Sequence, residues 1–229
     1  MTEAERPRAA MILAAGRGER MRPLTDSTPK PLLRVHDQPL IERHVVGLVR
    51  AGIERIVINL AWLGSQISGY LGDGSRYGAT IIYSEEAPRA LDTGGGIFRA
   101  LPHLSCGPFA VVNGDIYTDF PFETLALDAA HDAHLVLVPN PSYLKGDFGL
   151  DHGQAVAAAG ELFTFACIAV YRPAFFADCI DGVFPMMPLW RRSMAAGRCS
   201  AQLYTGPWED VGTPERLAAL NGKSSLGDI

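Results

Sequence analysis

A glycine-rich, cationic segment near the N-terminus has the residue types of a phosphate-binding loop. The segment, residues 13–25, directly follows an apolar stretch. Gly16 and Gly18 lack a Cβ, so the backbone there can approach an anion closely. Successive N–H groups in such a loop point at the anion, and Arg20 and Lys30 can add full charges. The segment therefore predicts a site for phosphates.

Two common phosphate-binding loops do not fit this segment. The dinucleotide-binding pattern G-x-G-x-x-G lacks its third glycine because Met21 stands there, and Pro23 disfavours a long helix directly after the loop. The P-loop pattern G-x-x-x-x-G-K-[ST] is also absent. An ordinary glycine turn with solvated arginines remains as the simplest alternative. The string Pro29-Lys30-Pro31 argues against it, because two prolines restrict the backbone and preset the direction of the lysine side chain.

Two aspartates are candidate ligands of a magnesium ion. Magnesium in phosphoryl and nucleotidyl transfer is usually held by one or two carboxylates together with phosphate oxygens. Asp115 comes just after the strand-like segment 109–112, which favours the metal role. Asp210 precedes a helix start and, on its own, is typical of an ordinary loop residue. Glu209 and Asp119 stand nearby and are interpreted as solvated or supporting carboxylates.

Strand and helix signals alternate along the first 140 residues. Strands are expected at 9–15, 55–60, 80–84, 109–112 and 135–138, and helices at 40–51, 62–71, 96–101 and around 122–130. This alternation predicts a largely parallel sheet that is covered by helices. Ligands of such sheets bind outside the carboxyl ends of the strands, so Gly16 and Asp115 should face one crevice.

The pattern loosens after residue 140. Segments 145–150 and 163–170 are expected to be strands that extend or cross the sheet, and 186–196 is expected to be a helix. A last helix should begin at Thr213-Pro214, because threonine is a good N-cap and proline suits the first helical position. No linker or repeat interrupts the chain, so a single domain over residues 1–229 is expected.

Composition excludes several classes of function. The chain has 229 residues and a formal net charge of −5, which argues against non-specific binding of nucleic acid. No run of about 18 apolar residues or signal-peptide pattern occurs, so no membrane association is expected. The four cysteines lie far apart without a C-x-x-C pair, which favours reduced thiols in a cytoplasmic protein over a zinc site. The oligomeric state is left open.

The loop and the two aspartates together resemble the sugar-1-phosphate nucleotidyltransferases. The family signature L-A-A-G-x-G-x-R-M-x-P-L-T, followed by P-K-P-L, is matched without a gap from Leu13 to Leu32. N-G-D at 113–115 and W-x-D-V-G-T at 208–213 match as well. The resemblance implies an α/β, Rossmann-like three-layer (GT-A-like) fold with a mixed, mostly parallel central sheet. It also implies that Asp115 and Asp210 jointly bind Mg²⁺.

The resemblance further implies a reaction. A sugar 1-phosphate attacks the α-phosphorus of a nucleoside triphosphate, and pyrophosphate leaves. The attacking phosphate has a second pKa of about 6, so no protein base is required. Arg20 should hold the β- and γ-phosphates, and Lys30 the α-phosphate or the sugar phosphate, with Asp115 and Asp210 completing the catalytic set. The residues implied to bind the nucleotide are Ala14, Ala15, Gly16, Gly18, Glu19, Arg20, Lys30, Thr93, Gly94 and Gly95.

A second glycine-rich string points to one branch of this family. Residues 92–96, D-T-G-G-G, resemble the bacterial N-acetylmuramate-1-phosphate uridylyltransferases of peptidoglycan recycling. Consecutive glycines allow close approach of the backbone to a ligand, although a tight turn before a helix would use them too. The branch implies UTP and N-acetylmuramic acid 1-phosphate as substrates. Alternatives are a mannose-, heptose- or glucose-1-phosphate nucleotidyltransferase, or a non-catalytic regulatory subunit that binds nucleotide sugars.

The acceptor site is assigned by the same resemblance. Residues 1–140 should form the nucleotide-binding half and residues 141–229 the sugar-binding half. The residues implied to bind the sugar are Asn113, Asn140, Gly146, Asp147 and Cys167. Cys167 stands where the family usually has glycine. Its side chain could narrow the sugar site or simply fill space.

Overall fold

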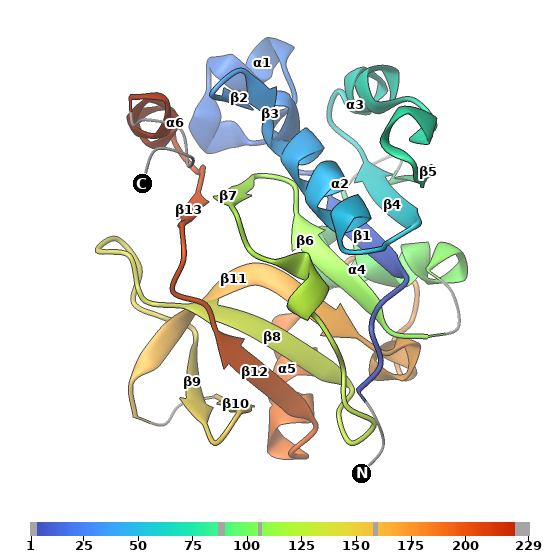
Figure 1. Ribbon diagram of the computed structural model, residues 1–229, viewed down its shortest axis with the longest axis vertical. Helices are drawn as coiled ribbons and strands as arrows, with labels where there is room; N and C mark the ends of the chain where they lie inside the picture. Colours follow the sequence, from blue (N-terminus) through green and yellow to red (C-terminus); the bar gives the residue numbers. More distant parts are fainter. Residues whose placement is uncertain (1–3, 87–89, 105–106, 158–159, 223–229) are drawn as a thin grey trace.

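The central feature of the fold is one mixed β-sheet. The structure is a computed structural model that describes residues 4–86, 90–104, 107–157 and 160–222. Within these residues the sheet has nine strands in the order β5-β4-β1-β6-β11-β8-β12-β10-β9 (Figure 1). Their bounds are β1 Ala9–Leu13, β4 Arg55–Leu60, β5 Thr80–Glu85, β6 Phe109–Asn113, β8 Ala133–Val138, β9 Phe148–Asp151, β10 Gln154–Val156, β11 Leu162–Tyr171 and β12 Cys199–Leu203.

The two halves of the sheet differ in strand direction. Neighbours among β5, β4, β1 and β6 are all parallel, as the alternation of strands and helices predicts. Strand β11 then runs antiparallel to both β6 and β8, β12 is parallel to β8, and β10 and β9 close the sheet as antiparallel strands. The mixed sheet expected from the family resemblance is therefore confirmed, but it is not mostly parallel, because the described strands of this sheet form four parallel and five antiparallel pairs.

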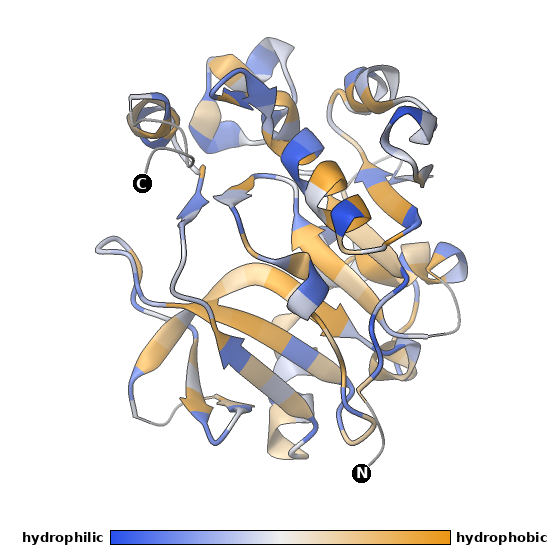
Figure 2. Cartoon of the chain, viewed as in Figure 1, coloured by the Kyte–Doolittle hydropathy of each residue, from blue (hydrophilic) through white to orange (hydrophobic). Residues whose placement is uncertain are grey.

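Helices cover both faces of the sheet. Helices α2 (Leu40–Arg50) and α3 (Gly64–Leu71) pack on one face, and α4 (Asp92–Ala100) and α5 (Met187–Ala195) pack on the other. Successive residues of β1 point to opposite faces, and residues on both faces are buried, so the strand is apolar throughout. In Figure 2 the neighbouring strands β4 and β6 are largely orange, the colour of hydrophobic residues. The three-layer arrangement is confirmed.

Short elements at the end of the sheet bring the C-terminal segment back to the N-terminal loop. They are α1 (Leu24–Ser27), β2 (Arg34–Val35), β3 (Gln38–Pro39), β7 (Ile116–Thr118), β13 (Trp208–Asp210) and α6 (Pro214–Asn221). Strand β13 pairs antiparallel with β7. A separate apolar cluster, which includes Met21, Tyr117 and Leu220, packs α6 against this end. Thr213 caps α6, because its hydroxyl accepts a hydrogen bond from the Arg216 backbone N–H, as predicted.

The predicted helix around 122–130 is wrong. Only a single 3₁₀ turn, Phe122–Thr124, forms there, and the chain then extends, with a β-bridge between Glu5 and Leu127. Phe122, Leu125 and Leu127 are all buried in one cluster. A short turn followed by an extended segment buries these three side chains together, which the helical interpretation did not consider. No helix of the described residues is long and apolar enough to cross a membrane.

His44 on α2 should make the stability of the fold sensitive to mild acid. Its Nε2 lies 3.0 Å from the carbonyl oxygen of Ile116, and burial lowers its pKa from 6.5 to about 4. Between these values the unfolded chain binds a proton and the native chain does not. The free energy of unfolding should therefore fall as the pH drops from 6.5 towards 4, by at most roughly 3 kcal/mol. Urea unfolding at several pH values measures this slope. An equally steep slope in His44→Gln would contradict the assignment.

Candidate active site

The glycine-rich loop after β1 lines a cavity together with Asp115. The cavity has a volume of about 360 Å³ and is lined by Leu13, Ala14, Gly16, Gly18, Glu19, Arg20, Lys30, Pro31 and Asp115. Gly18 is left-handed (φ +68°), and a Cβ there would come within 3.1 Å of Thr25 and 3.2 Å of Lys30. The predicted common crevice of Gly16 and Asp115 is confirmed.

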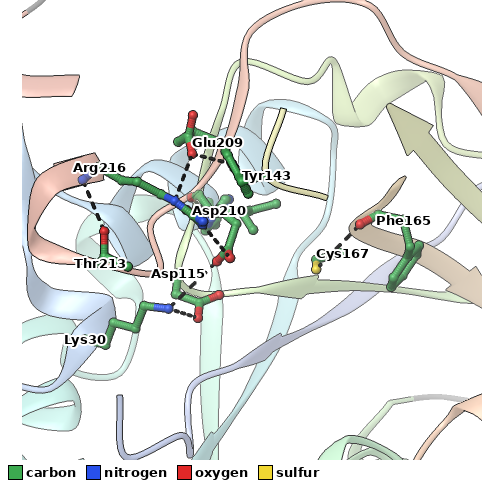
Figure 3. A network of polar contacts seen from close by, with 11 residues as sticks. Lys30, Asp115, Tyr143, Phe165, Cys167, Glu209, Asp210, Thr213 and Arg216 are labelled. Carbon is green, nitrogen blue, oxygen red and sulfur yellow. Dashed lines mark hydrogen bonds and ion pairs between the residues drawn. The ribbon is translucent and has the colours of Figure 1, made fainter. Parts of the chain in front are cut away.

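Lys30 lies between the two predicted metal-binding aspartates. Its Nζ is 2.6 Å from Oδ2 of Asp115 and 3.9 Å from Oδ1 of Asp210 (Figure 3). The lysine is buried, and these carboxylates offset the cost of burying its charge. The pairing of β13 with β7 places Asp210 opposite Ile116, directly after Asp115. Residues 95 positions apart in the chain are thus joined by a local strand pairing.

The aspartate pair fits a magnesium ion. Both carboxylates face the ammonium of Lys30 in the structure, and carboxylate oxygens are the ligands that Mg²⁺ prefers. Among the described residues, no cluster of three or more His, Cys, Asp or Glu side chains could hold a metal. Two carboxylates are nevertheless sufficient when phosphate oxygens supply further ligands. Arg20 is near the pair, because a Cβ on Gly212 would lie 3.3 Å from Nη1 of Arg20 and 3.0 Å from Oδ2 of Asp210.

A second cavity adjoins Asp210 on the side of the antiparallel strands. Its volume is about 190 Å³, and it is lined by Leu144, Asp147, Phe148, Thr164, Phe165, Cys167, Met187, Trp190, Trp208 and Asp210. Two of the predicted sugar-binding residues, Asp147 and Cys167, line it. The carboxylate of Asp147 is held in place because its Oδ2 accepts a hydrogen bond from the Phe165 N–H.

The other predicted sugar-binding residues do not line this cavity. The side chain of Asn140 donates to the carbonyl of Leu162 and accepts from the hydroxyl of Thr164. Gly146 has a φ of +81°, and a Cβ there would lie 2.9 Å from Oδ1 of Asn140. These two residues therefore shape the loop that carries Asp147. Asn113 ends β6 beside Leu13. Contact of Asn113, Asn140 and Gly146 with a sugar stays a prediction.

Cys167 occupies a backbone position that suits glycine. Its φ is +58°, and the pairing of β11 with β8 shifts register around it, between Phe165 and Ala169. Burial raises the pKa of its thiol, and Asp115 and Asp210 raise the pKa further. The thiol is therefore protonated at neutral pH and is a poor nucleophile. The left-handed conformation accounts for the glycine that the family usually has here.

Substitutions at Cys167 should separate backbone strain from packing. Cys167→Gly removes the strain of a left-handed Cβ but adds freedom to the unfolded chain, so stability should change by less than about 1 kcal/mol. Cys167→Val places a β-branched side chain at positive φ and should destabilise by about 2 kcal/mol or more. Denaturant unfolding of the two variants measures the difference. A valine variant as stable as the glycine variant would refute the role of the backbone.

The three consecutive glycines lie inside α4 and are buried by the protein itself. A Cβ on Gly94 would be 2.5 Å from the ring of Phe184, and one on Gly95 would be 2.1 Å from the carbonyl oxygen of Gly182. A Cβ on Gly96 would be 2.3 Å from Oε1 of Glu86. The helix was predicted to begin at Gly96 but begins at Asp92, so the glycines are helical, and residues 182–184 fill the space beside Gly94 and Gly95. Nucleotide contact of Thr93, Gly94 and Gly95 stays a prediction.

The tight packing at Gly95 should make it intolerant of alanine. Alanine normally favours a helix over glycine, but here its Cβ meets a backbone oxygen that cannot rotate away. Gly95→Ala should therefore destabilise by about 2 kcal/mol. Gly69 in α3 has open space around its Cβ position, so Gly69→Ala should stabilise by about 0.5–1 kcal/mol. Thermal unfolding of both variants checks the contrast, and a stabilising Gly95→Ala would contradict the packing argument.

A buried polar chain ties α4 to the phosphate loop. Oδ1 of Asn59 accepts from the Ala14 N–H at 2.7 Å, and its Nδ2 donates to Glu86 at 2.7 Å. The other oxygen of Glu86 accepts from the Leu91 N–H. Asn59 and Glu86 were missed by the sequence reasoning, because neither stands in a recognisable motif. They fix the backbone at Ala14, where the phosphate loop begins, and at Leu91, just before α4.

A further cavity beside the loop was also missed. Its volume is about 640 Å³, and it is lined by Ala15, Arg17, Leu60, Ala61, Trp62, Leu63, Gly64, Ser65, Ser68, Glu85, Glu86 and Ala90. The guanidinium of Arg17 stacks on the ring of Trp62 at 3.7 Å and pairs with Asp26 at 2.8 Å. This cavity extends the phosphate site towards β5.

Comparisons with known proteins show the family of the chain. Residues 9–157 match the nucleotidyl transferase family. An N-acetylmuramate alpha-1-phosphate uridylyltransferase from Neisseria meningitidis is 50% identical over 219 residues, covering 91% of this chain and 94% of its own. One from Caulobacter vibrioides is 36% identical, covering 93% and 96%. In fold, HddC from Yersinia pseudotuberculosis superposes with a TM-score of 0.75 at 21% identity, covering 93% of this chain and 97% of its own. The chain belongs to the nucleotidyl transferase family.

Proposed function

We infer that the chain transfers a uridylyl group from UTP to N-acetyl-α-muramic acid 1-phosphate, giving UDP-N-acetylmuramic acid and pyrophosphate. The observation that carries this inference is the 50% identity to the Neisseria uridylyltransferase over almost the full length of both chains. The assembled group of Arg20, Lys30, Asp115 and Asp210 supports a catalytic protein, since a regulatory subunit has no need for all four.

The proposed reaction places two anions in line and offsets their charge. An oxygen of the sugar phosphate forms a bond to the α-phosphorus of UTP, and the bond from that phosphorus to the β-phosphate oxygen breaks. Lys30, buried between the aspartates, is in position to contact the α-phosphate or the attacking phosphate. Arg20, at the rim of the loop cavity, is in position to hold the departing pyrophosphate. Positioning and charge compensation supply the rate enhancement.

Asp115 and Asp210 are the residues that would hold Mg²⁺. A bound magnesium ion supplies positive charge that stabilises the phosphate oxygens in the transition state. Both carboxylates face the ammonium of Lys30, and Asp115 also lines the loop cavity. Removing divalent cations with EDTA is expected to abolish turnover, and added Mg²⁺ is expected to restore it.

The two substrates are assigned to different halves of the chain. Residues 1–140 supply the lining of the phosphate cavity, residues 141–229 supply the lining of the cavity around Asp147 and Cys167, and strands of both parts form one sheet. This arrangement supports a nucleotide-binding first half and a sugar-binding second half. The Cys167, Cys179 and Cys199 thiols are free, which supports a role in the cytoplasm. The identity to N-acetylmuramate alpha-1-phosphate uridylyltransferases supports a role in peptidoglycan recycling.

A matrix of substrates tests the proposed function. Pyrophosphate release is measured for UTP, GTP, CTP and dTTP, each with the 1-phosphates of N-acetylmuramic acid, N-acetylglucosamine, glucose and mannose. The highest kcat/KM is expected for UTP with N-acetylmuramic acid 1-phosphate. Turnover of GTP with mannose 1-phosphate, without turnover of UTP, would overturn the substrate assignment while leaving the reaction class intact.

A further inference from the structure

Arg216 of α6 reaches away from its helix to the metal-binding aspartate. Its Nη1 donates to the carbonyl oxygen of Asp210 at 3.1 Å and to Oδ2 of the same residue at 3.2 Å. The other carboxylate oxygen, Oδ1, faces Nζ of Lys30 at 3.9 Å (Figure 3). The two oxygens of Asp210 therefore have different partners. One is anchored to α6, and the other is directed towards Lys30.

The aromatic ring of Tyr143 stacks on the guanidinium of Arg216. Its ring centroid lies 3.5 Å from the guanidinium carbon, and its hydroxyl donates to Glu209. Oε1 of Glu209 is 3.9 Å from Nε of Arg216. The guanidinium is thus fixed by an aromatic face and by two neighbouring carboxylates. Tyr143 belongs to the loop between β8 and β9, which also carries Asp147 of the acceptor cavity.

The contacts of the Arg216 side chain are not needed to form α6. The helix is capped by the hydroxyl of Thr213, which bonds to the backbone N–H of Arg216 and not to its side chain. The side chain instead fills the space over Gly212, where a Cβ would lie 3.1 Å from its Nη1. It is 22% exposed, so its charge is only partly screened by water. The cap at Thr213 therefore holds the start of α6 without this side chain.

We propose that Arg216 is a positioning residue that holds Asp210 as a one-oxygen metal ligand, and that Tyr143 couples this hold to the acceptor loop. The proposal rests on the proposed function in one respect, that Asp210 binds Mg²⁺. Lysine is a poor replacement for the arginine, because a compact ammonium lacks the flat face that stacks on the Tyr143 ring while one nitrogen bonds Asp210. Partners that orient a metal ligand typically change metal affinity by 10- to 100-fold when mutated.

Binding of Mn²⁺, used as a spectroscopic substitute for Mg²⁺, tests the proposal without turnover. Free Mn²⁺ is measured by electron paramagnetic resonance in the presence of UTP and the absence of acceptor. Arg216→Lys is expected to weaken Mn²⁺ binding by about 10-fold and to lower kcat by a similar factor, with KM for UTP changed by less than about threefold. Arg191→Lys, at an exposed arginine of α5, is the matched control and should behave as wild type.

Variants at Tyr143 test the coupling to the acceptor loop. Tyr143→Phe keeps the ring over the guanidinium and loses only the bond to Glu209, so Mn²⁺ affinity should stay within about twofold of wild type. Tyr143→Ala loses both contacts and should weaken Mn²⁺ binding and raise KM for the acceptor. The side chain is on an exposed loop, so this variant should fold even if Arg216→Lys does not.

The outcomes separate this proposal from the proposed function. Unchanged Mn²⁺ affinity in both Arg216→Lys and Tyr143→Ala would overturn it, whatever the substrates are. Weakened Mn²⁺ binding in these variants would support it even if wild type did not use UTP with N-acetylmuramic acid 1-phosphate. Failure of wild type to use any substrate pair, with intact Mn²⁺ binding, would overturn the proposed function alone.

Discussion

Asp115→Asn is expected to lower kcat by at least about 100-fold, the scale of losing one preorganised charge contact in a transfer site. Asparagine keeps the size of the side chain but removes the negative charge that faces Lys30 at 2.6 Å. Magnesium would then have one carboxylate in place of two. Pyrophosphate release at saturating UTP and acceptor, over a range of Mg²⁺ concentrations, measures the loss.

Asp119→Asn provides the control for this substitution. Asp119 lies four positions further along the chain and accepts a hydrogen bond from the hydroxyl of Tyr204, away from Lys30. The kcat of the Asp119→Asn enzyme should stay within about threefold of wild type, as for an ordinary surface substitution. If Asp115→Asn also retained a wild-type kcat, the assignment of Asp115 to the metal would be wrong.

Lys30→Met is expected to cause a loss of similar size, at least about 100-fold in kcat. Methionine keeps most of the aliphatic length of the lysine and removes its charge. In the described structure, Lys30 is the ion-pair partner of Asp115, so the variant leaves two carboxylates facing each other without it. Excess Mg²⁺ should offset the repulsion between the two carboxylates. It should not restore the rate, because no positive charge then contacts the phosphate from the position of the Lys30 ammonium.

Arg50→Met is the matched control for Lys30→Met. Arg50 is an exposed cation at the end of α2, outside the loop cavity, so its loss should leave kcat within about threefold of wild type. Circular dichroism and thermal unfolding at high Mg²⁺ show whether Lys30→Met is folded. A folded Lys30→Met enzyme with a wild-type rate would remove Lys30 from the proposed catalytic set.

Much of the parallel half of the fold could be predicted because its signals are local. Strand 55–60 and helix 40–51 were predicted to within a residue or two, since each carries its own apolar period and its own stop. The signature loop was equally informative. Its glycines, Arg20 and Lys30 are close in sequence, and the prolines around Lys30 set its direction locally.

The parts that failed depend on distant contacts. The helix at the glycines was predicted to begin only at Gly96, whereas it begins at Asp92, and the space beside Gly94 and Gly95 is filled by residues 182–184, almost 90 positions away. The turn at Phe122 ends as it does because the following chain pairs with Glu5. No local pattern contains such information.

The residues of the candidate site also differ in whether local signals or distant contacts place them. Asp210 on its own is typical of a loop residue, and only the pairing of β13 with β7 brings it to Lys30. The family resemblance supplied what local reasoning could not. Arg216 and Tyr143 were missed by both, because their contact joins a helix to a loop more than 70 residues away.

The fate of isotopically labelled acceptor tests the central claim most directly. N-acetylmuramic acid 1-phosphate carrying ¹⁸O in its terminal phosphate oxygens is incubated with UTP, Mg²⁺ and the enzyme, and the products are analysed by mass spectrometry. The account predicts UDP-N-acetylmuramic acid that retains all of the label, together with an equal amount of unlabelled pyrophosphate. The absence of UDP-N-acetylmuramic acid, or the appearance of label in pyrophosphate, would contradict it.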